Sequence, residues 1–128
     1  MSSIGFYTIV KNEQRRIGTL LNTLKHIASE LIVVDTGSSD DTCRIAKSTG
    51  AKIIYYPDSE DFSFSRARNM ALDNVSAEWI LTLDADEEID PEDLREIERL
   101  TSLEDYRYYI FGRFSDITLY TQRTIYKL

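Results

Sequence analysis

The chain has 128 residues, of which 42% are hydrophobic, so it is long enough to form one domain with a buried core. Its single cysteine, Cys43, excludes an intrachain disulfide, and its net charge of −7 argues against a general nucleic-acid binder. No apolar run approaches the roughly 20 residues of a membrane helix, and no signal peptide is visible. We therefore expect a cytoplasmic protein with no membrane span, a location that includes the inner face of the membrane.

The chain alternates between segments with strand character and segments with helical periodicity. Four apolar runs rich in β-forming residues predict strands at Ile4–Val10, Leu31–Val34, Lys52–Tyr56 and Trp79–Leu83. Apolar residues at three- and four-residue steps predict helices between them, over Ile17–Ala28, Thr42–Ser48 and Ser65–Asn74. A fourth helix is expected to start at Asp90-Pro91, because Asp is a good N-cap and Pro suits the first helical position.

The C-terminal segment is aromatic and β-branched, and it predicts two further strands at Tyr106–Phe114 and Thr118–Leu128. The order β-α-β-α-β-α-β-α-β-β predicts an α/β fold, with a mostly parallel, Rossmann-like sheet and helices on both faces. We expect one domain over residues 1–128. An open sheet edge near the C-terminus would favour a homodimer.

Polar residues follow three of the predicted strands. Lys11-Asn12-Glu13 follows the first, Asp35-Thr36-Gly37-Ser38 ends the second, and Asp84-Ala85-Asp86 follows the fourth. Parallel α/β sheets bind ligands at the carboxyl ends of their strands, so these groups are expected to gather along one edge. Alternate residues of an extended chain face the same way, so Asp84 and Asp86 could both reach a Mg²⁺ or Mn²⁺ ion that bridges a diphosphate.

Other interpretations of these acidic residues compete with a metal site. A calcium-binding EF-hand loop starting at Asp84 fails, because its sixth and twelfth positions hold Ile89 and Arg95 instead of glycine and glutamate. An aspartate-nucleophile phosphatase usually places this motif on its first strand, so it ranks low. Asp35 could simply cap a local turn, and the acidic run from Asp84 to Asp105 is mostly explained as a solvated helix face.

Four segments together resemble the N-terminal half of family 2 glycosyltransferases, which have the GT-A fold. They are Thr8–Glu13, Leu31–Thr42 with its Val-Asp-x-Gly-Ser core, Phe62–Leu72 with Ala-Arg-Asn, and Trp79–Glu87 with Asp-x-Asp. Each motif alone is modest, but four in the family's order along nearly the whole chain are a strong signal. The resemblance implies a metal-dependent transfer of sugar from a nucleotide donor, with UDP expected, to an acceptor hydroxyl with inversion.

The resemblance also implies roles by position. Asp35 would contact the uracil or ribose of the UDP-sugar, Asp84 would lie near the ribose and donor sugar, and Asp86 would hold Mn²⁺ or Mg²⁺. The nucleotide pocket would be lined or supported by a further set of residues: Thr8, Asn12, Glu13 and Arg68.

The family's acceptor site and catalytic base come from later sequence, so neither the base nor the acceptor is identified here. A nucleotide-binding module without turnover is therefore the alternative function. A sugar-phosphate nucleotidyltransferase ranks third, since Thr8–Asn12 lacks the glycine-rich loop that such enzymes usually carry after their first strand.

Overall fold

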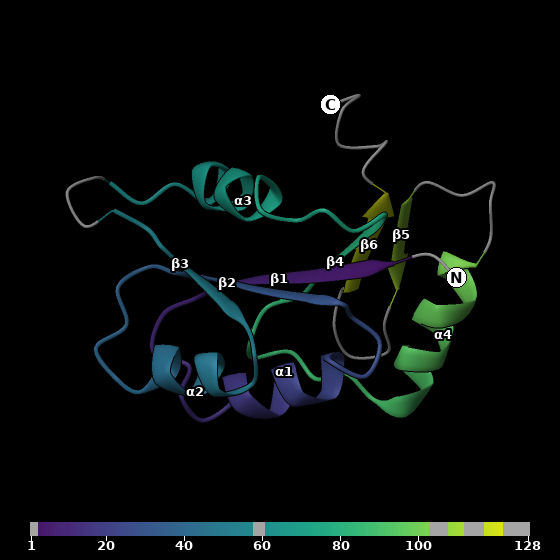
Figure 1. The fold of residues 1–128 in the computed structure, drawn as a ribbon, viewed down its shortest axis with the longest axis horizontal. Helices are drawn as coiled ribbons and strands as arrows, with labels where there is room; N and C mark the ends of the chain where they lie inside the picture. Colours follow the sequence, from purple (N-terminus) through teal and green to yellow (C-terminus); the bar gives the residue numbers. More distant parts are fainter. Residues whose placement is uncertain (1–2, 58–60, 103–107, 112–116, 122–128) are drawn as a thin grey trace.

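A computed structural model describes residues 3–57, 61–102, 108–111 and 117–121. It contains one six-stranded sheet with the strand order β3-β2-β1-β4-β6-β5, flanked by helices (Figure 1). The elements follow the predicted alternation: β1 Ile4–Val10, α1 Ile17–Leu24, β2 Glu30–Asp35, α2 Thr42–Ser48, β3 Lys52–Tyr55, α3 Phe64–Leu72, β4 Trp79–Thr82, α4 Pro91–Thr101, β5 Tyr108–Phe111 and β6 Ile117–Thr121. The predicted α/β class is confirmed.

The first four strands are parallel, and β1 lies between β2 and β4. In the register, Val10 of β1 is level with Asp35 of β2, and Tyr7 is level with Thr82 of β4. The loops that follow β1, β2 and β4 therefore leave the sheet along the same edge. Strand β6 pairs antiparallel with β4, and β5 pairs antiparallel with β6. The homodimer expected from an open C-terminal edge stays a prediction.

Each face of the sheet carries its own hydrophobic core, because side chains alternate between the faces along a strand. One core joins Phe6 and Val33 to residues of α1, α2 and α4, including Leu21. The other joins Tyr7 and Ile80 to small residues of α3. Helices α1, α2 and α4 thus cover one face while α3 covers the other, as Figure 1 shows. Helices on both faces agree with the prediction from sequence.

Strand β1 has no room for a side chain at Gly5. A Cβ atom there would lie 2.7 Å from Val75 Cγ1 and 3.2 Å from Ala77 Cβ. The segment that leads from α3 into β4 therefore packs directly on the backbone of β1. Glycine at this position brings β4 alongside β1, and with it the polar segment that follows β4.

The boundaries of several elements differ from the predicted ones. Helix α1 ends at Leu24, although its apolar periodicity continues to Ala28. Ile27 and Ala28 still pack against the core, but the chain turns there, and Ser29 N donates to Ile4 O at 2.9 Å. The two C-terminal strands are shorter than predicted, and residues 103–107, 112–116 and 122–128 of those predictions lie outside the described residues. Among the helices of the described chain, none is both long and apolar enough to cross a membrane.

Candidate functional site

Asp35 ends β2 with a buried carboxylate, of which only 5% is exposed. Its Oδ2 accepts hydrogen bonds from the N–H groups of Gly37 and Ser38, each at 3.2 Å. Gly37 has a φ of 115°, a conformation that favours glycine. Asp35 therefore does cap a local turn, as the competing interpretation proposed, but with one oxygen only.

The other carboxylate oxygen of Asp35, Oδ1, is buried and has no hydrogen-bond partner within the described residues. Leaving a buried polar atom without a partner costs roughly 1–3 kcal/mol, and more if it carries charge. A donor from a bound ligand would remove this cost. Local turn formation does not account for this second oxygen.

Cys43 of α2 lies beside Asp35. Burial raises the pKa of the Cys43 thiol, and the negative charge of Asp35 raises it further. The thiol therefore stays protonated at neutral pH. This agrees with the sequence-based view of Cys43 as a small packed residue, and it argues against a nucleophilic role.

Hydrogen bonds fasten the loop after β1 to the loop after β2. Asn12, whose φ is 53°, donates its backbone N–H to Ser38 Oγ at 2.9 Å, and its Oδ1 accepts from Ser39 N at 2.8 Å. Glu13 N donates to Thr42 Oγ1 at 2.9 Å. Asn12 and Glu13 therefore hold the loop that carries the turn of Asp35, which is the supporting role implied for them.

Thr42 is the buried centre of this connection. Its hydroxyl accepts from Glu13 N and donates to Asp40 Oδ1, and its own N–H donates to the same Asp40 oxygen at 2.9 Å. The hydrogen bond from the Thr42 hydroxyl lowers the pKa of Asp40. Sequence analysis did not single out Thr42, although it belongs to the Leu31–Thr42 motif.

Asp84 and Asp86 follow β4 in a turn rather than in an extended chain. Glu87 N donates to Asp84 O at 3.0 Å, and Asp84 N donates to Glu87 Oε1 at 3.1 Å. The expected extended geometry is thus wrong, because the chain already turns at Ala85. Both aspartates are nonetheless exposed while Ala85 between them is buried, so the two carboxylates are both accessible to a ligand.

These two carboxylates fit a divalent cation that is bound together with phosphate groups. No group of three His, Cys, Asp or Glu side chains in the described part of the chain could hold a metal by itself. Mg²⁺, however, is usually held by one or two carboxylates, with substrate phosphates and water completing its shell. Asp84 and Asp86 supply that number of carboxylates.

Thr8 and Arg68 lie apart from this group. Thr8 is 1% exposed in β1, and its hydroxyl has no hydrogen-bond partner among the residues described. Arg68 is an exposed residue of α3, on the opposite face of the sheet from α1 and α2. The structure thus brings Asn12 and Glu13 together with the turn of Asp35, but it shows no contact that joins Thr8 or Arg68 to them.

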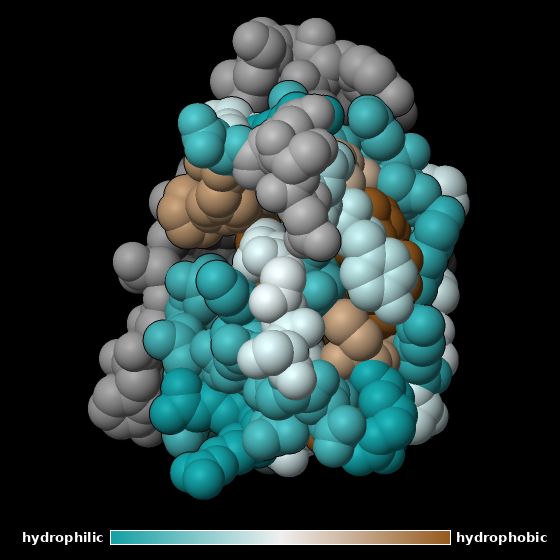
Figure 2. All heavy atoms as spheres, turned by 90° about the vertical axis from the view of Figure 1, so that its left-hand side faces the viewer, coloured by the Kyte–Doolittle hydropathy of each residue, from teal (hydrophilic) through white to brown (hydrophobic). Residues whose placement is uncertain are grey.

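An aromatic group lies next to β2 on the side of β3. Tyr56 N donates to Asp35 O at 2.8 Å, and the Tyr56 hydroxyl holds the start of α3 by accepting from Ser63 N at 3.1 Å. Phe62 and Phe64 stack edge-to-face with a centroid distance of 4.7 Å and are 47% and 67% exposed. Figure 2 shows hydrophobic surface interrupting an otherwise largely hydrophilic face at this end of the molecule.

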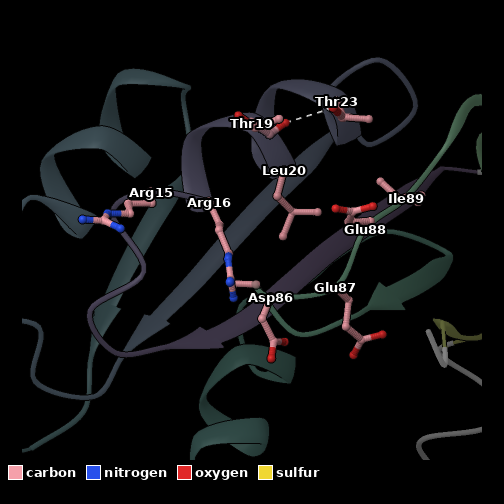
Figure 3. A pocket seen from close by; sticks show the side chains of 10 residues that line it. Arg15, Arg16, Thr19, Leu20, Thr23, Asp86, Glu87, Glu88 and Ile89 are labelled. Carbon is pink, nitrogen blue, oxygen red and sulfur yellow. Dashed lines mark hydrogen bonds between the residues drawn. The ribbon is translucent and has the colours of Figure 1, made fainter. Parts of the chain in front are cut away.

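A pocket of about 410 Å³ lies between α1 and the segment that follows β4. One wall comes from the start of α1 and its first turns, and the other from residues 85–89. Figure 3 shows the Arg16 side chain pointing toward Asp86, with Glu87 and Glu88 further along the same wall and Arg15 directed away. The pocket thus adjoins the Asp-x-Asp turn, and sequence analysis missed its arginine wall.

Taken together, the parallel sheet and the acidic edge at the ends of β1, β2 and β4 define a Rossmann-like domain of the GT-A glycosyltransferase class. The family model of Glycosyl transferase family 2 matches residues 6–125. The chain therefore belongs to glycosyl transferase family 2.

Relatives and solved structures agree with this assignment. An uncharacterized glycosyltransferase of Rickettsia typhi is 35% identical over 120 residues, which cover 94% of this chain and 40% of the relative. The glycosyltransferase SunS of Bacillus phage SPbeta is 41% identical over 80 residues, which cover 61% of this chain and 18% of the relative. The chain thus spans two fifths or less of these relatives.

Among solved structures, glucosyl-3-phosphoglycerate synthase from Mycobacterium tuberculosis in complex with Mn²⁺, UDP and glucosyl-3-phosphoglycerate has a TM-score of 0.66. The match covers 84% of this chain and 42% of that chain at 23% identity. Another crystal of that synthase holds Mg²⁺ and UDP. At this identity the likeness supports the fold.

Proposed function

We propose that this chain forms the donor-binding part of a metal-dependent glycosyltransferase that uses a nucleotide-sugar, with UDP as the nucleotide. The observation that carries the proposal is the combination, at one sheet edge, of the unpartnered Oδ1 of Asp35 with the two exposed carboxylates of Asp84 and Asp86. The first suits a hydrogen-bond donor of a nucleoside, and the second suits a metal-bound diphosphate. The UDP and Mn²⁺ in the mycobacterial synthase support the same choice of ligands.

Each residue has a distinct part in this proposal. Asp35 Oδ1 accepts a hydrogen bond from the base or ribose, while Asp84 lies toward the ribose and the donor sugar. Asp86 holds Mn²⁺ or Mg²⁺, which when bound neutralises the diphosphate and stabilises it as a leaving group. Asn12 and Glu13 hold the loops in place, and Arg68 stays a proposed member of the pocket.

The proposed reaction is a direct displacement with inversion. The acceptor hydroxyl oxygen bonds to the anomeric carbon as the bond from that carbon to the diphosphate oxygen breaks. The diphosphate leaves with the electron pair, and the hydroxyl proton passes to a base. We assign no base and no acceptor within the described residues.

A nucleotide-binding module without transfer is the second candidate. It is favoured because the described residues offer groups for the donor but no assigned base. Release of sugar from a UDP-sugar by this chain would exclude that candidate. The match to a glycosyltransferase family leaves a sugar-phosphate nucleotidyltransferase without support.

The test is calorimetric titration of the chain with UDP, with and without Mn²⁺. We expect binding that needs the metal, and an affinity about tenfold or more lower in Asp86→Asn. Asp73→Asn is the matched control, because Asp73 is exposed at the C-terminal end of α3. Metal-independent affinity, or equal losses in both variants of a folded protein, would refute the proposal.

A further inference from the structure

Two arginines stand where a helix normally avoids positive charge. Arg16 is the N-cap of α1, its side chain makes no capping hydrogen bond, and the first turn of α1 contains no acidic residue. Helix α4 shows the usual arrangement, with Asp90 as N-cap and with Glu92 and Asp93 in its first turn. The positive end of a helix repels cations and favours caps such as Ser or Asp, so the Arg15-Arg16 pair does not serve the stability of α1.

The two arginines differ in what they face. Across the pocket between α1 and residues 85–89, Arg16 points toward Asp86, whereas Arg15 points away (Figure 3). Arg16 and Asp86 are both exposed, and exposed charge pairs contribute little to folding, typically about 0–1 kcal/mol. A structural salt bridge is therefore a weak reason for an arginine at this position.

We infer that Arg16 is a binding residue of the donor site that offsets the charge of Asp86 until metal and nucleotide arrive together. This inference rests on the proposed function. A divalent cation at Asp86 repels the Arg16 guanidinium, so the metal alone binds less well with Arg16 present. A diphosphate brings negative charge that the guanidinium can contact through paired hydrogen bonds.

The consequence is that metal and nucleotide depend on each other for binding. Without nucleotide, Arg16 competes with the cation for the carboxylate of Asp86. With nucleotide, the same side chain moves its attraction to the diphosphate, and the competition ends. By linkage, whatever the nucleotide adds to metal affinity the metal adds to nucleotide affinity. The pocket beside Arg16 gives the side chain space for this change of partner.

The test compares Arg16→Gln with Arg15→Gln as the matched control in the full chain. Binding of Mn²⁺ without nucleotide is followed by the electron paramagnetic resonance signal of the free ion. Binding of UDP at saturating Mn²⁺ is followed by calorimetry. We expect Arg16→Gln to bind Mn²⁺ alone about threefold more tightly and UDP about tenfold more weakly, on the scale of one close charge at a solvated site. Arg15→Gln should change both affinities by less than about twofold, because its side chain points away.

Arg16→Lys separates charge from geometry. It keeps the positive charge, so the affinity for Mn²⁺ alone should match that of the unaltered chain. It loses the paired hydrogen bonds of a guanidinium, so UDP should still bind more weakly. A role limited to the shape of the pocket would not give this pattern.

Opposite shifts in the two affinities of Arg16→Gln support the inference. It is overturned if both affinities fall, which marks a structural role, or if either stays at the unaltered value. If Asp86→Asn loses UDP while Arg16→Gln behaves as the unaltered chain, the proposed function stands and only this inference fails. If the unaltered chain binds no UDP with Mn²⁺, the proposed function and this inference fail together.

Discussion

Replacing Asp35 by Asn should separate nucleotide binding from stability. Asparagine keeps one carbonyl oxygen for the hydrogen bonds from Gly37 N and Ser38 N, and it puts an NH₂ group where the unpartnered Oδ1 now lies. A ligand donor would then face another donor. Losing a hydrogen bond to a charged group costs about 1.5–3 kcal/mol, so UDP affinity should fall by roughly tenfold to 150-fold.

The stability of Asp35→Asn should change by less than about 1 kcal/mol. The turn loses the charge assistance of its two hydrogen bonds, but a buried charge with an unpartnered oxygen is removed at the same time. Asp35→Ala lacks both acceptors, so it should lose about 1–3 kcal/mol of unfolding free energy. Urea unfolding measures the stabilities, and calorimetry with UDP and Mn²⁺ measures the affinities. UDP affinity in Asp35→Asn equal to that of the unaltered chain would refute a ligand role for Oδ1.

Three further predictions concern the scaffold of the site. Gly5→Ala should lower the unfolding free energy by about 1–3 kcal/mol, because its Cβ would lie 2.7 Å from Val75 Cγ1; an unchanged urea midpoint would contradict this packing. Thr42→Val removes the acceptor of Glu13 N and should cost about 1–3 kcal/mol, with faster hydrogen exchange in the loop after β1; unchanged exchange would mean that Thr42 does not hold the loop. Because the folded-state pKa of Asp40 is lowered from 3.8, its contribution to stability is present above that value and lost as pH falls through the folded pKa. Thr42→Val should weaken this acid dependence in urea titrations between pH 5 and pH 2, and an identical pH profile would exclude the Thr42 hydroxyl as its cause.

The polar residues after the strands could be predicted as a group because strand order constrains them. Once Ile4–Val10, Leu31–Val34 and Trp79–Leu83 are assigned as parallel strands, the residues that follow must share an edge. The structure agrees, with Asp35 level with Val10. The buried state of Asp35 could not be predicted, since it depends on how α2 packs across the end of β2.

The connections between loops were beyond sequence analysis. Asn12 adopts a positive φ and spans to Ser38 and Ser39, more than 20 residues away in the chain, and no local pattern marks such a pair. The end of α1 at Leu24 was missed for a different reason. Ile27 and Ala28 keep the helical spacing because they pack on the same core, even though the backbone has left the helix.

Arg16 did leave a signal in the sequence that was not used. Two consecutive basic residues directly before a predicted helix contradict the usual preference for acidic and hydroxyl side chains there. Departures from local rules of this kind often mark functional positions. At the start of α4 the rule is obeyed, and there Asp90 and Asp93 form a capping box.

The most direct test of the account is to locate bound Mn²⁺ by paramagnetic broadening of backbone amide signals in the presence of UDP. The account predicts broadening of the amides of residues 84–87, weaker broadening at Gly37 and Ser38, and none at Asp73 at the end of α3. Omission of UDP should remove most of the effect. Broadening that centres on another part of the chain, or that is the same with and without UDP, would contradict a donor site at the ends of β2 and β4.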